Sequence, residues 1–177
     1  MRRLTRVALA LAFGLTFGGC RRSAQNIPAD ATREETRELA TMVHVADPRT
    51  SLQLIRGFHE IEQNAWRWTM ARFAVTLRAP SGASEKGATL VLQGAVPDPV
   101  IAQLKAVTLT ADVEGVPLPP ETFTRPGEYL YRRDVPPKAF PAEAVTVNFT
   151  LDKALAPGEA DHRELGIVVT SVGFEAK

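Results

Sequence analysis

The chain has 177 residues, of which 45% are hydrophobic and 23% are charged, and its formal net charge is +1. This length suits one ordinary domain and is too short for two. The near-neutral charge and the lack of any run rich in Lys and Arg argue against a nucleic-acid partner, because no phosphate-binding face can form.

The first nineteen residues have the pattern of a signal peptide. Arg2, Arg3 and Arg6 form a basic start, and the apolar run over residues 7–17 follows directly. That run is too short for a permanent membrane helix, which needs about 20 apolar residues. We therefore expect residues 1–19 to be a signal and not part of the fold.

The only cysteine of the chain, Cys20, stands directly after Gly18 and Gly19. This arrangement resembles a bacterial lipoprotein signal, in which the cysteine is lipidated on its thiol, for example with palmitate, and becomes the mature N-terminus. The resemblance implies a lipoprotein of the cell envelope, attached to a membrane by its lipid. The alternative is an ordinary secretory signal with a stray cysteine. With Cys20 used in this way, a disulfide or a cysteine metal site is excluded.

Residues 20–48 are interpreted as a tether that contains one short helix. Thr32 and Glu35 form a capping-box pattern, and apolar residues at helical spacing behind it predict a helix over about residues 33–43. Asp47-Pro48 prevents its continuation. The folded domain is then expected over residues 49–177.

The densest aromatic stretch is Trp66-Arg67-Trp68-Thr69, which contains both tryptophans of the chain. Apolar residues share one parity before residue 71 and the other parity after it: Trp66, Trp68 and Met70, then Phe73, Val75 and Leu77. A change of phase near Ala71 requires a bulge or a corner between two strands. We predict two strands here.

Alternation and turn residues predict about eight short strands, with a polar loop over residues 58–64 and another over residues 80–87. The strands are expected near residues 52–54, 66–70, 73–77, 89–93, 107–113, 128–135, 145–151 and 165–174, with a brief return strand at 116–118 after a turn at Glu114-Gly115. The crossover helices of a parallel fold are lacking. The expected fold class is all-β, a jelly-roll-like antiparallel β-sandwich preceded by one short N-terminal helix.

Three segments together resemble a β-sandwich module found in bacterial envelope proteins and appended to membrane glycosyltransferases of polysaccharide assembly. They are Gly57-Phe58 with Glu60 and Glu62 leading to Arg67-Trp68-Thr69, then residues 145–153, then Asp161 with residues 163–166 running into residues 172–174. The resemblance covers residues 51–176. It implies a jelly-roll-like sandwich and an association with glycans, and it implies no catalytic residue.

Trp66 and Trp68 are candidates for a sugar-stacking platform, because an indole face suits the apolar face of a pyranose. The alternative for either indole, favoured for Trp68, is a place in the core. Arg67 points to the opposite face and could bind a carboxylate of a ligand. An ion pair with Glu60 or Glu62 is the favoured interpretation of Arg67.

Two acidic stretches complete the candidate ligand-binding set. His59, Glu60 and Glu62 form the first, and Asp161 and Arg163 form the second, where a local Asp–Arg pair is the favoured interpretation. Nothing in their spacing matches a metal-site motif, so we predict no metal and no cofactor. No Gly-x-Ser-x-Gly elbow is present either.

The favoured function is that of a lipid-anchored envelope protein with a non-catalytic binding or accessory module, for a glycan or a polysaccharide-assembly protein. One alternative is a structural or protein-docking lipoprotein that never binds sugar. A third is a hydrolase that uses acidic residues such as Glu60, Glu62 or Glu164.

Overall fold

The computed structural model describes residues 38–159 and 161–177. The expected signal, Cys20 and the tether up to residue 37 lie outside these residues. The elements, in chain order, are β1 (Met42–His44), the 3₁₀ turn η2 (Pro48–Gln53), β2 (Leu54–Glu62), β3 (Trp66–Arg78), α1 (Ala83–Lys86), β4 (Ala88–Val96), α2 (Asp98–Leu104), β5 (Val107–Val113), β6 (Val116–Phe123), β7 (Gly127–Val135), the 3₁₀ turn η3 (Pro137–Ala139), β8 (Ala144–Leu151) and β9 (Val168–Ala176).

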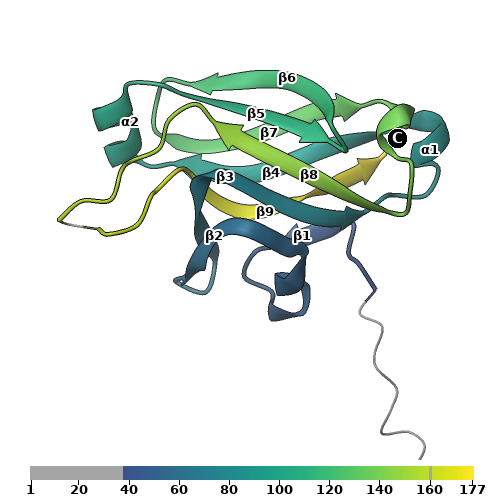
Figure 1. The fold of residues 1–177 in the computed structure, drawn as a ribbon, viewed down its shortest axis with the longest axis horizontal. Coiled ribbons are helices and arrows are strands. Elements are labelled where there is room, and N and C mark those ends of the chain that lie inside the picture. Colours follow the sequence, from purple (N-terminus) through teal and green to yellow (C-terminus); the bar gives the residue numbers. More distant parts are fainter. Residues whose placement is uncertain (1–37, 160) are drawn as a thin grey trace, which may run out of the picture. The chain divides into compact units, whose positions relative to one another are not determined.

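The nine strands of the described residues belong to one continuous antiparallel sheet, whose main path has the order β6-β5-β8-β3-β9-β4-β7. The strands from β6 to β3 form one layer of the sandwich, and β9, β4 and β7 continue from β3 into the other layer (Figure 1). Strand β2 pairs with β3, and β1 pairs with β9. The expected all-β antiparallel sandwich is confirmed, with nine strands where about eight were predicted.

The inward faces of the two layers of this sheet form the core. Strand β5 alternates buried Val107, Leu109, Ala111 and Val113 with more exposed residues, as its sequence pattern predicts. On the adjacent strands β3 and β8 the directly paired residues Phe73 and Phe149 stack their rings with centroids 4.8 Å apart. The buried side chains of the described residues are apolar except for Gln53, Thr69 and Ser171, so hydrophobic burial is the main stabilising contribution.

The two outermost strands of the sheet path, β6 and β7, are joined by side chains of β7. Tyr131 donates its hydroxyl to the carbonyl of Pro119 at 3.0 Å, and burial raises its pKa to about 12. Arg133 stands over the Tyr131 ring and pairs with Glu121 at 2.7 Å. The prolines of β6 are tolerated because an edge strand needs fewer backbone donors.

Strand β3 is one continuous strand of 13 residues, so the predicted division into two strands is wrong. Buried Thr69, Phe73, Val75 and Leu77 share one face of β3, and the two tryptophans lie on the other face, where Ala74 is also buried. The apparent change of phase has another cause: β3 changes its neighbour. It pairs with β9 at Arg67 and Trp68 and with β8 from Arg72 onward.

The N-terminal expectations need correction. Residues 38–43 are not helical, and Met42 and Val43 belong to β1, so the described part of the predicted helix over 33–43 is wrong. Val43 is fully buried against β9, which means that the sandwich begins before the expected boundary at residue 49. Burial of this short apolar segment outweighs its weak helical pattern.

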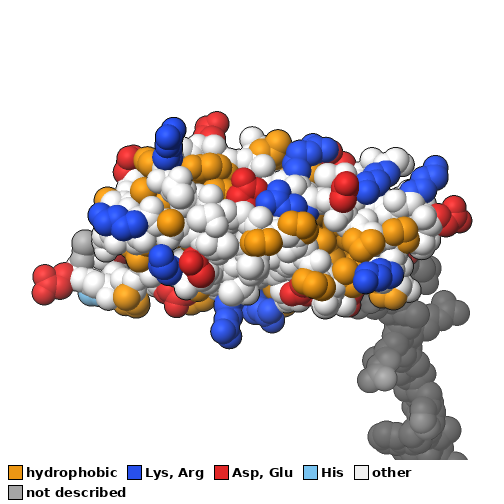
Figure 2. Space-filling view, turned by 90° about the horizontal axis from the view of Figure 1, so that it is seen from above, with side chains coloured by type: hydrophobic (Ala, Val, Ile, Leu, Met, Phe, Trp, Pro, Cys, Tyr) orange, Lys and Arg blue, Asp and Glu red, His pale blue; other side chains and the backbone are white. Residues whose placement is uncertain are grey.

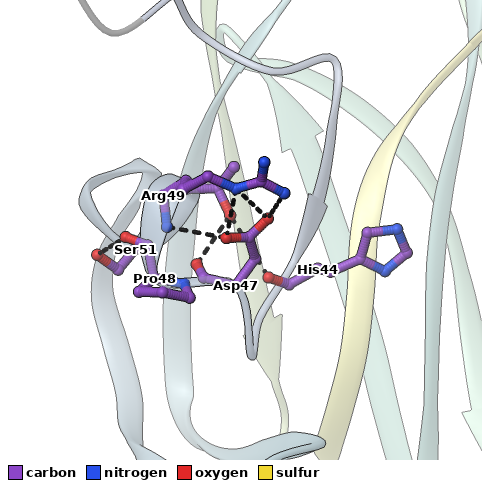
Figure 3. Close-up of polar contacts among 6 residues, drawn as sticks. His44, Asp47, Pro48, Arg49 and Ser51 are labelled. Carbon is purple, nitrogen blue, oxygen red and sulfur yellow. Dashed lines mark hydrogen bonds and ion pairs between the residues drawn. The ribbon is translucent and has the colours of Figure 1, made fainter.

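The chain between β1 and β2 is fixed by two polar residues. Asp47 accepts hydrogen bonds from the backbone and the guanidinium of Arg49 and so caps η2 (Figure 3). The side chain of buried Gln53 accepts a hydrogen bond from the backbone N–H of Ala40 and donates one to the carbonyl of Ala40. It also donates to the carbonyl of Thr76 at 2.7 Å. Gln53 therefore fastens the start of the domain onto β3.

The segment predicted as a loop over 58–64 is mostly strand, because β2 extends to Glu62. The polar residues of this segment suggested a loop. They are compatible with a strand because β2 lies at a sheet edge, and its pairing with β3 has several bulges. One bulge is at Gly57, whose φ is +75° and where a Cβ would lie 2.1 Å from the carbonyl oxygen of Arg72. The predicted turn at Glu114-Gly115 is confirmed, since both residues have positive φ between β5 and β6.

The connections contain two short helices, α1 and α2, where loop or turn was predicted. Among the described residues no helix is both long and apolar enough to cross a bilayer. The face in Figure 2 carries basic and acidic side chains side by side among hydrophobic ones.

Candidate functional site

The first candidate region is the outer face of the sheet formed by β3, β9, β4 and β7. Trp68 pairs directly with Val168, Val168 with Ala95, and Ala95 with Glu128, so these four residues form one row across four strands. Directly opposed residues on one face have Cβ atoms about 5 Å apart. The row thus places an indole at one end, a carboxylate at the other, and two small apolar residues between them.

Neighbouring positions two residues along each strand extend this row into a surface, because alternate residues share a face. They enclose a groove of about 800 Å³, which we call the tryptophan groove. Its lining residues are Glu62, Trp66, Trp68, Gln93–Asp98, Gly127–Leu130, Val168 and Thr170. The groove combines a mainly apolar floor with acids and an amide at its rim.

The two tryptophans have different positions in the groove. Both are half-buried, but Trp68 also packs against the hydrophobic core, whereas Trp66 lies at the start of β3 beside the β2–β3 turn. The core interpretation of Trp68 is therefore partly correct, since its ring contributes to packing and to the groove. Trp66 also lines the groove but is not among the side chains that pack against the core.

Arg67 lies on the face opposite the tryptophans, as expected from alternation. Its guanidinium donates to the backbone carbonyl of Val45 at 2.8 Å and to that of His59 at 2.9 Å. The predicted ion pair with Glu60 or Glu62 is wrong, because two backbone carbonyls lie within reach first. Arg67 joins β1, β2 and β3, and its donors point away from the groove.

The second candidate region is the Arg163 cluster, which consists of Asp161, Arg163 and Glu62. Arg163 binds Asp161 through two nitrogens and pairs with Glu62 at 2.9 Å. The predicted local Asp–Arg pair is confirmed. Hydrogen bonds from the Arg163 side chain and backbone lower the pKa of Asp161 from 3.8 to about 2, and the carboxylates raise the pKa of Arg163.

The loop after this cluster is attached to β3 at the point where β3 changes its neighbour. The Glu164 carboxylate accepts the backbone N–H of Ala71 at 2.6 Å, and the carbonyl of Glu164 lies 2.6 Å from Nε2 of His59. Ala71 falls between the residues paired with β9 and those paired with β8. Glu164 therefore satisfies a backbone donor at this transition.

Gly166 explains why the loop can approach β3 so closely. A Cβ at this position would lie 2.6 Å from Cδ1 of Leu151 and 2.7 Å from the hydroxyl of Thr69. The backbone of Gly166 instead donates to the carbonyl of Thr69, and buried Thr69 accepts from Ile167. The motif over residues 163–166 thus has a structural role in the contact between the loop and β3.

The acidic residues considered for hydrolysis have different surroundings. Glu62 is held by Arg163 and Glu164 by the Ala71 amide, whereas Glu60 is exposed and forms no side-chain hydrogen bond within the described part of the chain. The metal-ligating residue types also form no group of three over residues 38–159 and 161–177. The geometry gives the Arg163 cluster a positioning function for the loop.

Several groove residues escaped the sequence analysis: Gln93, Asp98, Glu128, Tyr129 and Leu130. Each lies on a strand or turn that the pattern detected, but neither the strand order nor the face was predictable. A second hollow, of about 530 Å³, lies between the start of the domain and the loops around α1 and η3. The Arg78 side chain at its wall pairs with Glu38, and the hollow contains none of the predicted site residues.

Comparisons with known proteins identify similar folds among solved structures. No family model matches the chain, and no curated protein matches it. The fold is similar to the crystal structure of the CBM36-1 domain of a multidomain xylanase from the hindgut metagenome of Trinervitermes trinervoides, with a TM-score of 0.42 and 9% sequence identity. The similarity covers 77% of this chain and 97% of that chain.

Proposed function

We propose that this protein is a non-catalytic binding module that holds a glycan in the tryptophan groove. The observation that carries the proposal is the row from Trp68 through Val168 and Ala95 to Glu128, with Trp66 beside it. An indole presents a large, rigid apolar face and so can stack on the apolar face of a sugar ring. The small side chains of the floor leave room for that ring.

The polar residues at the rim of the groove supply hydrogen-bond donors and acceptors for a sugar. Gln93 offers a donor and an acceptor, and Asp98 and Glu128 offer acceptors for hydroxyl groups; all three side chains are exposed. Strands lie about 4.8 Å apart, so Glu128 is about 14 Å from Trp68 across three intervals. A groove of this length accommodates several sugar units of an extended chain.

A glycan array probed with the full-length protein tests this proposal. We expect signals on envelope polysaccharides, and we expect Trp66→Ala to lose them while its melting temperature changes little. Arg72→Ala serves as the matched control, because Arg72 is an exposed β3 residue outside the groove lining. Silence of the unaltered protein across all glycans, or signals that survive in Trp66→Ala, would refute glycan binding in this groove.

We also propose that the protein is located in the cell envelope and is anchored to a membrane by a lipid on Cys20. The sequence Gly18-Gly19-Cys20 behind an apolar run supports it. A Cys20→Ser variant is expected to leave the membrane fraction, and labelled fatty acid should attach only to the unaltered chain. If the unaltered chain never incorporates fatty acid, the anchor is rejected and the groove proposal is unaffected.

Protein docking is the second candidate, and it is supported by two apolar side chains away from the groove. Leu52 is 78% exposed and Ile55 is 50% exposed, at η2 and the start of β2. A docking function predicts a polysaccharide-assembly membrane protein that still co-purifies after all glycans are removed. That association should be lost in a Leu52→Ser, Ile55→Ser variant and retained in Trp66→Ala.

A further inference from the structure

The tryptophan groove carries charges of one sign. Its lining contains three carboxylates, those of Glu62, Asp98 and Glu128, and within the described residues no Lys or Arg lines it. This balance is unlike that of the whole chain, which has 21 basic and 20 acidic residues. The local excess of negative charge is therefore a property of the groove and does not follow from the composition.

The three carboxylates are not equivalent. Glu62 is compensated by Arg163 at 2.9 Å, at the end of the groove next to Trp66. Asp98 and Glu128 are exposed and have no ion-pair partner within residues 38–159 and 161–177. The uncompensated charges thus lie at the start of α2 and on β7, across the groove from the indoles.

We infer that the groove selects glycans whose sugar rings carry free amines over neutral glycans, and neutral glycans over those that carry carboxylates. The inference rests on the proposed function and adds the class of glycan. A ring stacked on Trp66 or Trp68 would place the neighbouring units over Ala95 and toward Glu128, where an ammonium group is attracted and a carboxylate is repelled.

The size of this selection follows from the exposure of both acids. An exposed pair contributes little, and salt weakens it further. Two such pairs together should favour an amine-bearing oligosaccharide by roughly 5-fold to 20-fold at low salt. Stacking on the indoles is insensitive to salt by comparison, so the two contributions can be separated.

The test compares three hexasaccharides by titration calorimetry with the full-length protein: glucosamine, N-acetylglucosamine and galacturonic acid. Mildly acidic buffer of low ionic strength keeps amines protonated and carboxylates ionised. The glucosamine hexamer should bind most tightly and the galacturonic acid hexamer least. The preference for glucosamine should disappear in a variant with Asp98→Asn and Glu128→Gln, and it should shrink at high salt.

Two outcomes distinguish this inference from the proposed function. The selection would be overturned by equal affinity for the glucosamine and N-acetylglucosamine hexamers, or by tighter binding of the galacturonic acid hexamer. The groove would still be a glycan site in either case, provided that Trp66→Ala abolishes binding. Binding that persists unchanged in Trp66→Ala would instead overturn the groove itself. A Glu175→Gln variant, altered at an exposed carboxylate paired with Arg132 outside the groove, is the matched charge control.

Discussion

The tryptophan groove and the Arg163 cluster meet at Glu62 but are built in opposite ways. In the cluster and the following loop, polar groups have protein partners: Asp161 and Glu62 bind Arg163, and Glu164 binds the Ala71 amide. In the groove, apolar surface and two carboxylates lack such partners. A region whose polar groups are satisfied internally stabilises the fold, whereas one with unused stacking surface and acceptors is suited to a ligand.

This comparison predicts that changes in the loop reduce stability and changes in the groove reduce binding. The largest effect is expected for Gly166→Ala, because the new Cβ would overlap Leu151 and Thr69. Overpacking of this kind costs about 3 kcal/mol of unfolding free energy. Chemical denaturation measures it.

Gly158→Ala provides the control for that substitution, since nothing lies within 4 Å of a Cβ at Gly158. It should change stability by less than about 0.5 kcal/mol. If both variants are equally stable, the close approach of the loop to β3 is wrong.

Glu164→Ala should rank second. It leaves the N–H of Ala71 without its acceptor at a half-buried position, which costs about 2 kcal/mol. Glu164→Gln keeps an acceptor oxygen of the same reach and should recover most of the loss. Thermal unfolding of the two variants measures the difference, and an equal loss in both would argue against this hydrogen bond.

The two tryptophans should separate binding from stability. Trp66→Ala should weaken glycan binding at least 10-fold, about 1.4 kcal/mol, with little change in melting temperature. Trp68→Ala should weaken binding and also destabilise the fold, because Trp68 packs against the core. Calorimetric titration and thermal unfolding of both variants test this division, which fails if Trp66→Ala is the less stable protein.

The smallest expected effect is on the stability of the protein at acidic pH. The pKa of Asp161 is lowered from 3.8 to about 2 in the folded protein, so its contribution to stability is complete above about pH 4 and is lost as the pH falls toward 2. Asp161→Asn should flatten the pH dependence of unfolding in this window and leave it unchanged near neutrality. Denaturation curves from pH 2 to pH 7 test the prediction, and an unchanged acid limb would contradict it.

Much of the fold was predictable because burial on one face imposes alternation. The pattern identified β5, β7, β8 and the Glu114-Gly115 turn with nearly correct bounds. Strand β3 was misread because its first part pairs with β9 and the rest pairs with β8, and this change of neighbour is not visible in the sequence. The N-terminal segment was misread because three residues of β1 show no alternation long enough to outweigh a capping box.

The candidate site was predictable only where it is local. Trp66, Trp68, Asp161 and Arg163 stand out by residue type, and the local pairing of the last two is confirmed. Gln93, Asp98 and Glu128 carry no signal of their own, since they join the groove only through the order β3-β9-β4-β7. Strand order depends on contacts distant in sequence, which periodicity does not encode.

NMR signals of the two indole N–H groups should show that ligand contacts the tryptophan groove and not the Arg163 cluster. The chain has only two tryptophans, so it gives two such signals. The ligand to add is the hexamer of glucosamine or of N-acetylglucosamine, whichever binds more tightly. We expect it to shift both indole signals and to leave the backbone amide signals of residues 161–166 unchanged. Shifts in those amides with unchanged indoles would contradict the account.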